Sequence, residues 1–258
     1  VAWTNEEGSR YSPGAMGSSV FAGLSETSEY LGITDVDGIL LGDDLATSLA
    51  ETGVPHRAQN SVMPHAYIEP HIEQGPVLEA HALQIGVVEG IQGIRFMDVV
   101  VTGEEAHAGT TPRRARKDAL SSAVAIITAL QELTSDEDDT TRFTVGRCIT
   151  NPGSPNTVPG RVQFTIDLRH PDKQVLHNLG DRIREVAEEN VGACSVTVSD
   201  NLLVDPTIFD PEIKDAIRDN AQRLGLKSMD MPSGAGHDAM HLAKVCPVGM
   251  IFVPCLRG

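Results

Sequence analysis

Apolar positions along the middle of the chain follow two different periods. Alternating or β-branched stretches predict strands over residues 96–101, 143–149, 162–168 and 195–198. A period of three to four residues predicts helices over 115–133 and 171–190. The apolar faces expected to be buried are Leu120, Val124, Ile127 and Leu130 in the first helix and Leu176, Leu179, Ile183 and Val186 in the second. The order β-α-β-β-α-β predicts a ferredoxin-like module over about residues 92–204.

The two flanks, residues 1–91 and 205–258, are expected to form one α/β domain into which this module is inserted. Strands are predicted over 66–71, 85–88 and 250–253, and helices over 211–224 and 236–244. Asp210 and Gly225 suit the two ends of the helix over 211–224. Residues 1–4 are expected to be the tail of a strand that delivers Glu6 and Glu7 into a loop. The predicted fold class is therefore α/β, with a ferredoxin-like insertion.

Composition narrows the class of protein. The chain has 258 residues, is 40% hydrophobic and carries a formal net charge of −16. This charge argues against nucleic-acid binding, which needs basic patches. No apolar run approaches the roughly 20 residues that a membrane span needs. The cysteines (Cys148, Cys194, Cys246 and Cys255) form no C-x-x-C pair, so they predict reduced thiols in a cytoplasmic protein rather than a zinc-thiolate site.

Several polar side chains stand beside glycines, where backbone approaches a ligand closely. Glu6 and Glu7 precede Gly8, and His71 closes a predicted strand ahead of a Gly-Pro turn. Paired carboxylates and a distant histidine suit metal-assisted hydrolysis, in which a carboxylate activates a metal-held water. The alternatives are a solvated acidic pair and a histidine satisfied within the core.

Three further residues could bind an anionic substrate. His107 lies in a loop between strand and helix, Asn156 in a turn, and Arg169 at the end of a predicted strand. An imidazole can donate to an oxyanion, and a guanidinium can grip a carboxylate. The alternatives are a surface loop for His107, a turn residue for Asn156 and a surface ion pair with Asp167 or Asp172 for Arg169.

Taken together, these motifs resemble the amidase, hydantoinase and carbamoylase branch of the M20 family of metal-dependent amidohydrolases. The resemblance covers essentially the whole chain and rests on motifs in the right order. They are residues 5–10, 70–76, 103–112, 155–160, 167–172 and 233–239. The resemblance implies that residues 1–91 and 205–258 form the catalytic domain and that residues 92–204 form a lid and dimerisation domain.

The resemblance also implies roles for single residues. Glu6 matches the general base, while Glu7 and His71 match ligands of two divalent ions, zinc or manganese. Substrate-binding positions are Gln74, His107, Asn156, Arg169, Ser233, Gly234, Ala235 and His237. In the family, the positions of His107 and Asn156 can reach the site of a neighbouring subunit, which implies a homodimer. The implied reaction is hydrolysis of a linear C–N bond in an N-carbamoyl amino acid, a small substrate that bears a carboxylate.

The chain departs from the family pattern in its metal ligands. An upstream histidine, a bridging aspartate and a final histidine have no counterpart in the sequence. We therefore expect an incomplete piece of a longer protein, which binds the catalytic metals poorly and has little activity by itself. The open alternatives are an allantoate amidohydrolase, an M20 dipeptidase, and a non-catalytic binding protein on a decayed amidohydrolase fold.

Overall fold

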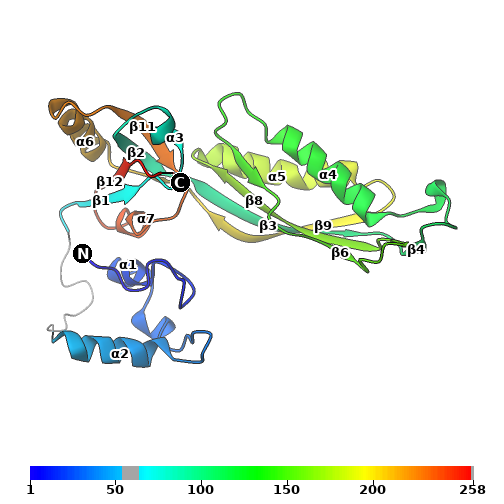
Figure 1. The fold of residues 1–258 in the computed structure, drawn as a ribbon, viewed down its shortest axis with the longest axis horizontal. Coiled ribbons are helices and arrows are strands. Elements are labelled where there is room, and N and C mark those ends of the chain that lie inside the picture. The colour runs from blue at the N-terminus through cyan, green and yellow to red at the C-terminus, as the bar shows by residue number, and fades with distance from the viewer. Residues whose placement is uncertain (54–63, 257–258) are drawn as a thin grey trace. The chain divides into compact units, whose positions relative to one another are not determined.

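The computed structural model describes residues 1–53 and 64–256. The chain divides into two compact units. The first unit comprises residues 1–91 and 207–258, and the second comprises residues 92–206 (Figure 1). The second unit is therefore a single stretch of chain that interrupts the first. In the part of the chain that the structure describes, no helix is both long and apolar enough to cross a bilayer.

The first unit is a mixed α/β layer. Its helices are α1 (Met16–Phe21), η1 (Thr27–Glu29), α2 (Leu41–Thr52), α3 (Val77–Ala80), α6 (Pro211–Arg223) and α7 (Ala239–Leu242). Its strands are β1 (Tyr67–Ile72), β2 (Ile85–Ile91), β10 (Thr207–Ile208), β11 (Ser228–Ser233) and β12 (Val248–Val253). They form one sheet in the order β1-β12-β2-β10, with β11 also paired to β2. The β1–β12 ladder is parallel and sets His71 beside Phe252.

The core of the first unit lies between this sheet and its helices. Leu78, Val88, Met250 and Phe252 are almost fully buried there. Residues of the short helix α7, including Ala239 and Leu242, join the same core. This packing anchors α7 beside β1, so the loop that leads into α7 is held over the end of that strand.

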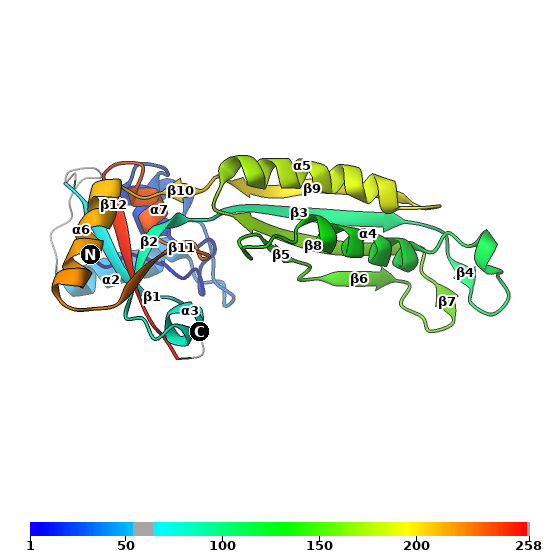
Figure 2. The same ribbon diagram turned by 90° about the horizontal axis from the view of Figure 1, so that it is seen from above.

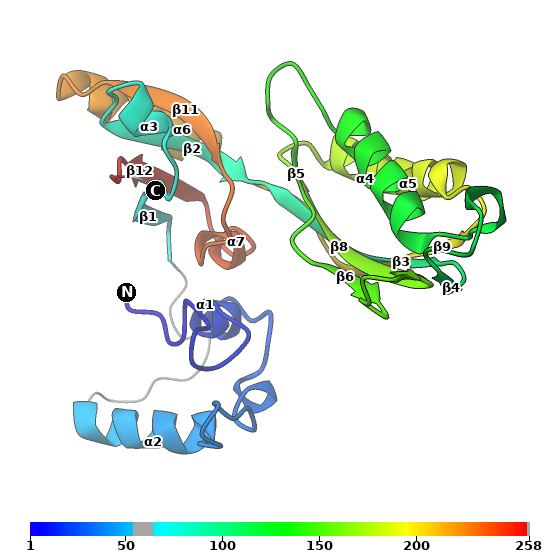
Figure 3. The same ribbon diagram turned by 45° about the vertical axis from the view of Figure 1, so that its right-hand side comes forward.

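The second unit is a sheet with two helices on one face (Figures 2 and 3). Its strands are β3 (Gly93–Thr102), β4 (Ala106–His107), β5 (Arg142–Thr144), β6 (Cys148–Asn151), β7 (Thr157–Val158), β8 (Arg161–His170) and β9 (Ser195–Val204). Its helices are η2 (Arg113–Ala115), α4 (Ala119–Leu133) and α5 (Lys173–Asn190). The main sheet has the order β5-β8-β3-β9, with β6 also paired to β8, while β4 and β7 form a separate two-stranded ladder.

The core of the second unit corrects the predicted face of α4. Leu130 is buried, but Leu120 and Val124 are 38% and 55% exposed. Ala119 and Ala123 are buried in their place. The helix begins at Ala119, where the Asp118 side chain accepts hydrogen bonds from the first turn. Ile126 is buried on the same face as the two alanines. Two apolar stripes therefore compete on this helix, and the one that packs contains Ala119, Ala123, Ile126 and Leu130.

Other predicted elements also need correction. Residues 1–4 form no strand; they lead into a loop. The predicted strand over 143–149 is divided into β5 and β6 around Gly146, and the helix predicted over 236–244 is reduced to the four residues of α7. Short elements depend on tertiary contacts more than on local pattern, so their extents were the least predictable.

Candidate functional site

Strand β1 presents Glu69 and His71 on the same side. Alternate residues of a strand point to the same face, and Tyr67, Glu69 and His71 are the half-buried positions of β1. The His71 ring donates from Nδ1 to the carbonyl of Ile72 at 2.7 Å, since a carbonyl oxygen can only accept. Its Nε2 therefore carries the lone pair.

A chain of hydrogen bonds holds Glu69. The indole Nε1 of Trp3 donates to the Tyr67 hydroxyl at 3.0 Å, and this hydroxyl donates to Glu69 Oε2 at 3.1 Å. The backbone N–H of Ala239 donates to the same oxygen at 3.0 Å. Both donors meet Oε2, so the carboxylate is fixed with Oε1 toward His237.

The loop between β11 and α7 positions His237. Its ring is 2% exposed, and Nε2 lies 2.8 Å from the Ser233 hydroxyl. The Ser233 hydroxyl donates to the Ala235 carbonyl, so His237 is the donor in the bond to Ser233. The free nitrogen Nδ1 lies 3.6 Å from Glu69 Oε1. The rings of His237 and His71 pack edge to face, with centroids 4.6 Å apart.

Glu6 and Glu7 lie in a tight loop that two close glycines make possible. A Cβ on Gly8 would stand 2.6 Å from the Gly14 nitrogen, and a Cβ on Gly14 would stand 2.6 Å from the Glu6 carbonyl oxygen. Asn5 has φ 52°, and its side-chain amide donates to the carbonyls of residues 11 and 13. The loop therefore fixes the backbone of Glu6, which is half-buried, whereas Glu7 is exposed.

A second buried cluster lies beside His237. Asp238 is 2% exposed, and its Oδ1 has no hydrogen-bond partner among the residues that the structure describes. Ser18, which is fully buried, lies 2.8 Å from His241 Nδ1. Burial lowers the pKa of His241, so this ring is held neutral.

Burial and mutual repulsion govern the electrostatics of these groups. The pKa of Glu6 is raised by burial and by the charges of Glu7 and Asp238, while His71 lowers it. Burial likewise raises the pKa of Glu69 and Asp238. Burial lowers the pKa of His237 to about 4, so that its imidazole is neutral at pH 7. Several carboxyl groups thus share a small region with neutral imidazoles, an arrangement suited to a cation.

Gln74 follows β1 in a strained turn. Its φ is 53°, in the left-handed region, and its side chain is exposed. The neighbouring Glu73 accepts from the backbone N–H groups of Val77 and Leu78 at 2.7 and 2.8 Å. Glu73 therefore fixes the start of α3, and this cap holds Gln74 at the edge of the turn.

In the second unit, His107 and Asn156 are brought together by the ladder of β4 and β7. His107 pairs with Thr157, and the Ala108 N–H donates to the Asn156 carbonyl at 2.9 Å. His107 Nδ1 accepts from the backbone N–H groups of Gly109 and Thr110. The proton of the neutral ring therefore lies on Nε2, where it can be donated outward to an oxyanion.

Arg169 lies near the other end of β8. Its guanidinium makes two hydrogen bonds to Asp167, at 2.9 and 2.8 Å, and lies over the Phe96 ring. The sequence-based alternative of an ion pair with Asp167 is thus what the structure contains. Arg169 follows Arg161 by eight residues of strand, which span about 26 Å at roughly 3.3 Å per residue. The β4–β7 ladder extends beyond the Arg161 end of β8, so one chain keeps Arg169 far from His107 and Asn156 (Figure 2).

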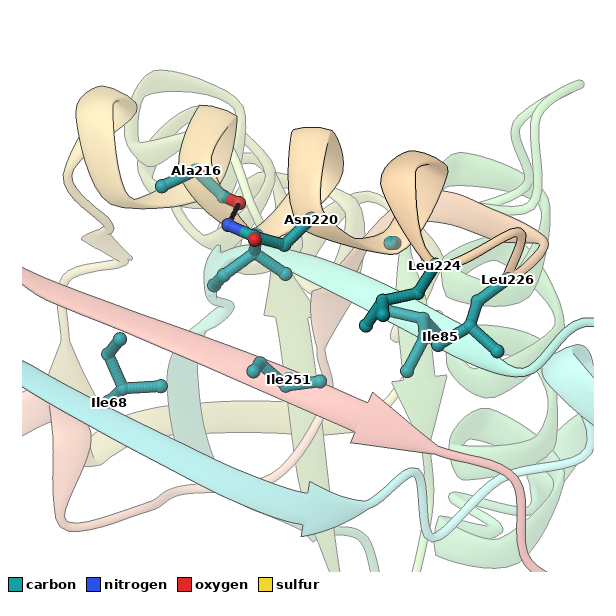
Figure 4. Close-up of a pocket in the computed structure, with 9 residues that line it drawn as sticks. Ile68, Ile85, Ala216, Asn220, Leu224, Leu226 and Ile251 are labelled. Atoms are coloured by element: carbon teal, nitrogen blue, oxygen red, sulfur yellow. Dashed lines mark hydrogen bonds between the residues drawn. The ribbon is translucent and has the colours of Figure 1, made fainter.

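An apolar hollow of about 250 Å³ lies between α6 and the sheet of the first unit. Figure 4 shows Ile68, Ile85, Ile251, Leu224 and Leu226 around it, with the Asn220 amide bonded to the helix backbone. Its lining offers little polar surface to orient a substrate. The chemistry of this unit is therefore concentrated at the polar groups around β1 and the loop after β11.

Sequence reasoning assigned no role to Glu69 and gave His237 a substrate-binding role. The structure brings one ligand atom of each within 4.8 Å of the other and of His71. Part of this arrangement could be predicted from the sequence, because Glu69 and His71 are two residues apart on a predicted strand and therefore share a face. The approach of His237 depends on the path of a loop, which local pattern does not determine.

Comparisons with known proteins place the chain in a family. The family model described as peptidase family M20/M25/M40 matches residues 1–258. An N-carbamoyl-L-amino-acid amidohydrolase from Rhizobium meliloti is 38% identical over 99% of this chain and 61% of its own length. An allantoate deiminase from Arabidopsis thaliana is 34% identical over 100% of this chain and 55% of its own length.

Solved structures agree with these relatives. A hydantoinase/carbamoylase family amidase from Burkholderia ambifaria superposes with a TM-score of 0.92 at 36% identity, over 99% of this chain and 62% of that chain. The chain thus spans about three fifths of the length of the carbamoyl amino-acid hydrolases that it matches. Because the family model matches from the first residue to the last, the chain belongs to the peptidase family M20/M25/M40.

Proposed function

We propose that the complete gene product hydrolyses the carbamoyl C–N bond of an N-carbamoyl amino acid and releases ammonia, carbon dioxide and the amino acid. The observation that carries this proposal is the loop of residues 5–15, which fixes the half-buried Glu6, whose pKa is raised by burial and by the charges of Glu7 and Asp238. A half-buried carboxyl beside a histidine with a free lone pair is what a metal-assisted hydrolase needs. Relatives named N-carbamoyl-L-amino-acid amidohydrolase support the choice of substrate.

In this proposal Glu6 takes a proton from the attacking water and later returns it to the leaving amine. Glu7 and His71 hold divalent ions, zinc or manganese, and His71 suits this role because its Nδ1 proton is already donated to Ile72. The proposed complement is two ions. When bound, such ions would lower the pKa of water and polarise the carbonyl.

The substrate is held by groups with matching chemistry. Arg169 binds the carboxylate, and the Asp167 contact holds its guanidinium in position until substrate arrives. His107 donates from Nε2 to the oxyanion, and Asn156 orients the carboxylate. Gln74 holds the ureido group, and the loop from Ser233 through Gly234 and Ala235 to His237 forms the pocket floor.

A homodimer would allow Arg169 to act on the same substrate as His107 and Asn156, although they are far apart within one second unit. Arg169 lies too far from His107 and Asn156 in one chain to hold the same small substrate. We propose that residues 92–206 form a lid and dimerisation domain, so that His107 and Asn156 of one subunit complete the site of the other. The exposed Leu120 and Val124 on α4 provide an apolar stripe for such an interface.

Ammonia release by the complete gene product, loaded with manganese or zinc, tests the function. An N-carbamoyl-L-amino acid, N-carbamoyl-β-alanine and allantoate would be compared side by side. We expect turnover of the first; turnover of allantoate alone would favour the reaction in the name of the Arabidopsis relative. Silence on all three with metal bound would overturn the proposal in favour of a dipeptidase or a non-catalytic relative.

Two variants test the roles. Glu6→Gln should lower kcat by about 10² or more, since it removes the base. Arg169→Ala should mainly raise KM, since it removes a carboxylate contact. The reverse pattern would reject these assignments. The chain of 258 residues alone is expected to show little turnover, because three expected ligands of the catalytic ions have no counterpart in it.

A further inference from the structure

We propose that His241 is a positioning residue for Glu6, which it holds in place through Ser18 and Ala15. The inference rests on the proposed function, because that function makes Glu6 the general base. It deepens that function, since His241 and Ser18 have no role in it. The residues come from two segments that are far apart in the sequence: the loop that leads into α1, with α1 itself, and the short helix α7.

The contact between the two segments is a hydrogen bond inside the first unit. The Ser18 hydroxyl lies 2.8 Å from His241 Nδ1, and Ser18 is fully buried. The same hydroxyl donates to the Ala15 carbonyl at 3.0 Å. Because a hydroxyl has a single proton, Ser18 must accept from His241. The His241 imidazole, which burial keeps neutral, therefore carries its proton on Nδ1 and uses it to hold Ser18.

Two further hydrogen bonds extend this constraint to Glu6. Ala15 accepts from Ser18 through its carbonyl, and its own N–H donates to the Glu6 carbonyl at 2.7 Å. Ala15 has a φ of 53°, in the left-handed region that a residue with a Cβ adopts only where its surroundings hold it there. Loss of the bond between His241 and Ser18 would therefore loosen the backbone of Ala15 and, with it, the backbone of Glu6.

Helix α7 is a firm support for this chain of hydrogen bonds. Ala239 and Leu242 are buried in the core of the first unit, and the Ala239 N–H donates to Glu69. Helix α1 packs against α7 (Figure 3). The alternative is that His241 only stabilises the fold. In that case removal of its hydrogen bond would change the free energy of unfolding, but neither the order of the Glu6 loop nor the rate of the proton transfer.

Steady-state kinetics of the complete gene product test the proposal, with an N-carbamoyl-L-amino acid and saturating manganese or zinc. We expect His241→Leu and Ser18→Ala each to lower kcat by about 10-fold or more with KM within about twofold, because a displacement of about 1 Å can cost about 100-fold in rate. His241→Asn should keep kcat within about threefold of wild type, because the asparagine amide nitrogen takes the place of Nδ1. The double variant should lose no more than the larger single loss, since both changes remove the same bond.

Amide hydrogen exchange in the 258-residue chain, followed by NMR, gives a readout that needs neither metal nor turnover. The Ala15 N–H, which bonds to the Glu6 carbonyl, should exchange about 10-fold faster or more in His241→Leu and in Ser18→Ala. In His241→Asn it should exchange at close to the wild-type rate. His81→Leu is the control, because this exposed ring contacts the Val77 carbonyl at the end of α3.

The outcomes separate this inference from the proposed function. Wild-type turnover with an unchanged kcat in His241→Leu and Ser18→Ala would overturn the inference and leave the function standing. Silence of the wild type on every substrate would overturn the function, whereas Ala15 exchange that neither variant changes would overturn the inference alone. Equal losses in His241→Leu and His241→Asn would also overturn it, since the hydrogen bond would not be the cause. Circular dichroism checks folding, and Ser18→Ala, which removes one oxygen atom, decides the matter if His241→Leu does not fold.

Discussion

At the scale of single residues, Arg95 is a buried charged side chain that needs hydrogen bonds and opposite charges around it. Its side chain is buried in the second unit and donates to Asp200, Asp181 and the His177 carbonyl. The bond from Arg95 is the largest cause that lowers the pKa of Asp200. This carboxylate therefore contributes to stability in its charged form.

Asp200→Asn should lower the free energy of unfolding of the chain at pH 7 by about 1–2 kcal/mol, a value reduced because Asp200 is a third exposed. A lowered folded-state pKa means that the contribution is complete above the unfolded-state value near 3.8 and is lost as pH falls through the folded-state pKa. The difference in the free energy of unfolding between wild type and Asp200→Asn, measured by urea denaturation, should therefore become smaller as the pH falls through that pKa. Asp98→Asn, at the more exposed pair with Arg147, is the control, with a change below about 1 kcal/mol.

Some residues of the candidate site could be predicted from the sequence, and others could not. Glu6, Glu7 and His71 stand out because glycines and a strand end flank them in the sequence. Glu69 could have been found from its spacing to His71, since alternate strand residues share a face. The approach of His237 could not, because it depends on a buried loop closed by Ser233.

At the scale of elements, α5 approaches the sheet closely through Gly180. A Cβ there would stand 2.2 Å from the Arg95 Nη1 and 2.5 Å from its Cδ. Although a guanidinium is flexible in general, Arg95 is buried and held by its acceptors, so it cannot easily give way. The glycine therefore allows the helix to cover the buried cation.

Gly180→Ala should destabilise the chain by about 1–3 kcal/mol despite the better helix propensity of alanine, which is worth about 1 kcal/mol. Thermal unfolding followed by circular dichroism measures this change. Gly146→Ala is the control, because a Cβ at that position meets nothing within 4 Å and its φ is not positive. Equal effects from the two substitutions would show that close packing at Gly180 is not the cause.

The predicted elements succeeded where an apolar stripe was unambiguous. In α5, Leu176, Ile183 and Val186 are buried as predicted. In α4 two stripes compete, and only the tertiary structure decides between them. Leu120 and Val124, which the sequence predicted to be buried, are exposed on α4. This exposed pair is the proposed dimer contact that the next experiment tests.

A double variant, Leu120→Ser with Val124→Ser, should weaken the proposed dimer, because these residues are four apart and lie on one face of α4. Sedimentation velocity over a concentration series of the complete gene product should then show more monomer. Leu202→Ser with Leu203→Ser is the matched control, since these residues on the edge strand β9 are 42% and 44% exposed. A shift in the control but not in the α4 variant would place the interface at β9 instead.

At the scale of the whole molecule, the composite site can be tested by mixing inactive variants. At substrate concentrations near the wild-type KM, His107→Ala and Arg169→Ala should each release little ammonia as homodimers of the complete gene product. In a mixed dimer one site receives an intact Arg169 from the first subunit and an intact His107 from the second. With half of the dimers mixed and one of two sites intact, subunit exchange should restore about a quarter of wild-type ammonia release.

The matched control mixes His107→Ala with Asn156→Ala. These two residues lie together on the β4–β7 ladder, so they reach any site from the same chain. Every site in the mixture then lacks one of them, and no activity should return. Recovery in the first mixture but not in the second follows only if His107 and Asn156 reach each site from one subunit and Arg169 reaches it from the other. Failure of both mixtures, with dimers shown to exchange, would mean that all three residues serve one chain, and the roughly 26 Å along β8 would then have to close by a rearrangement of the second unit.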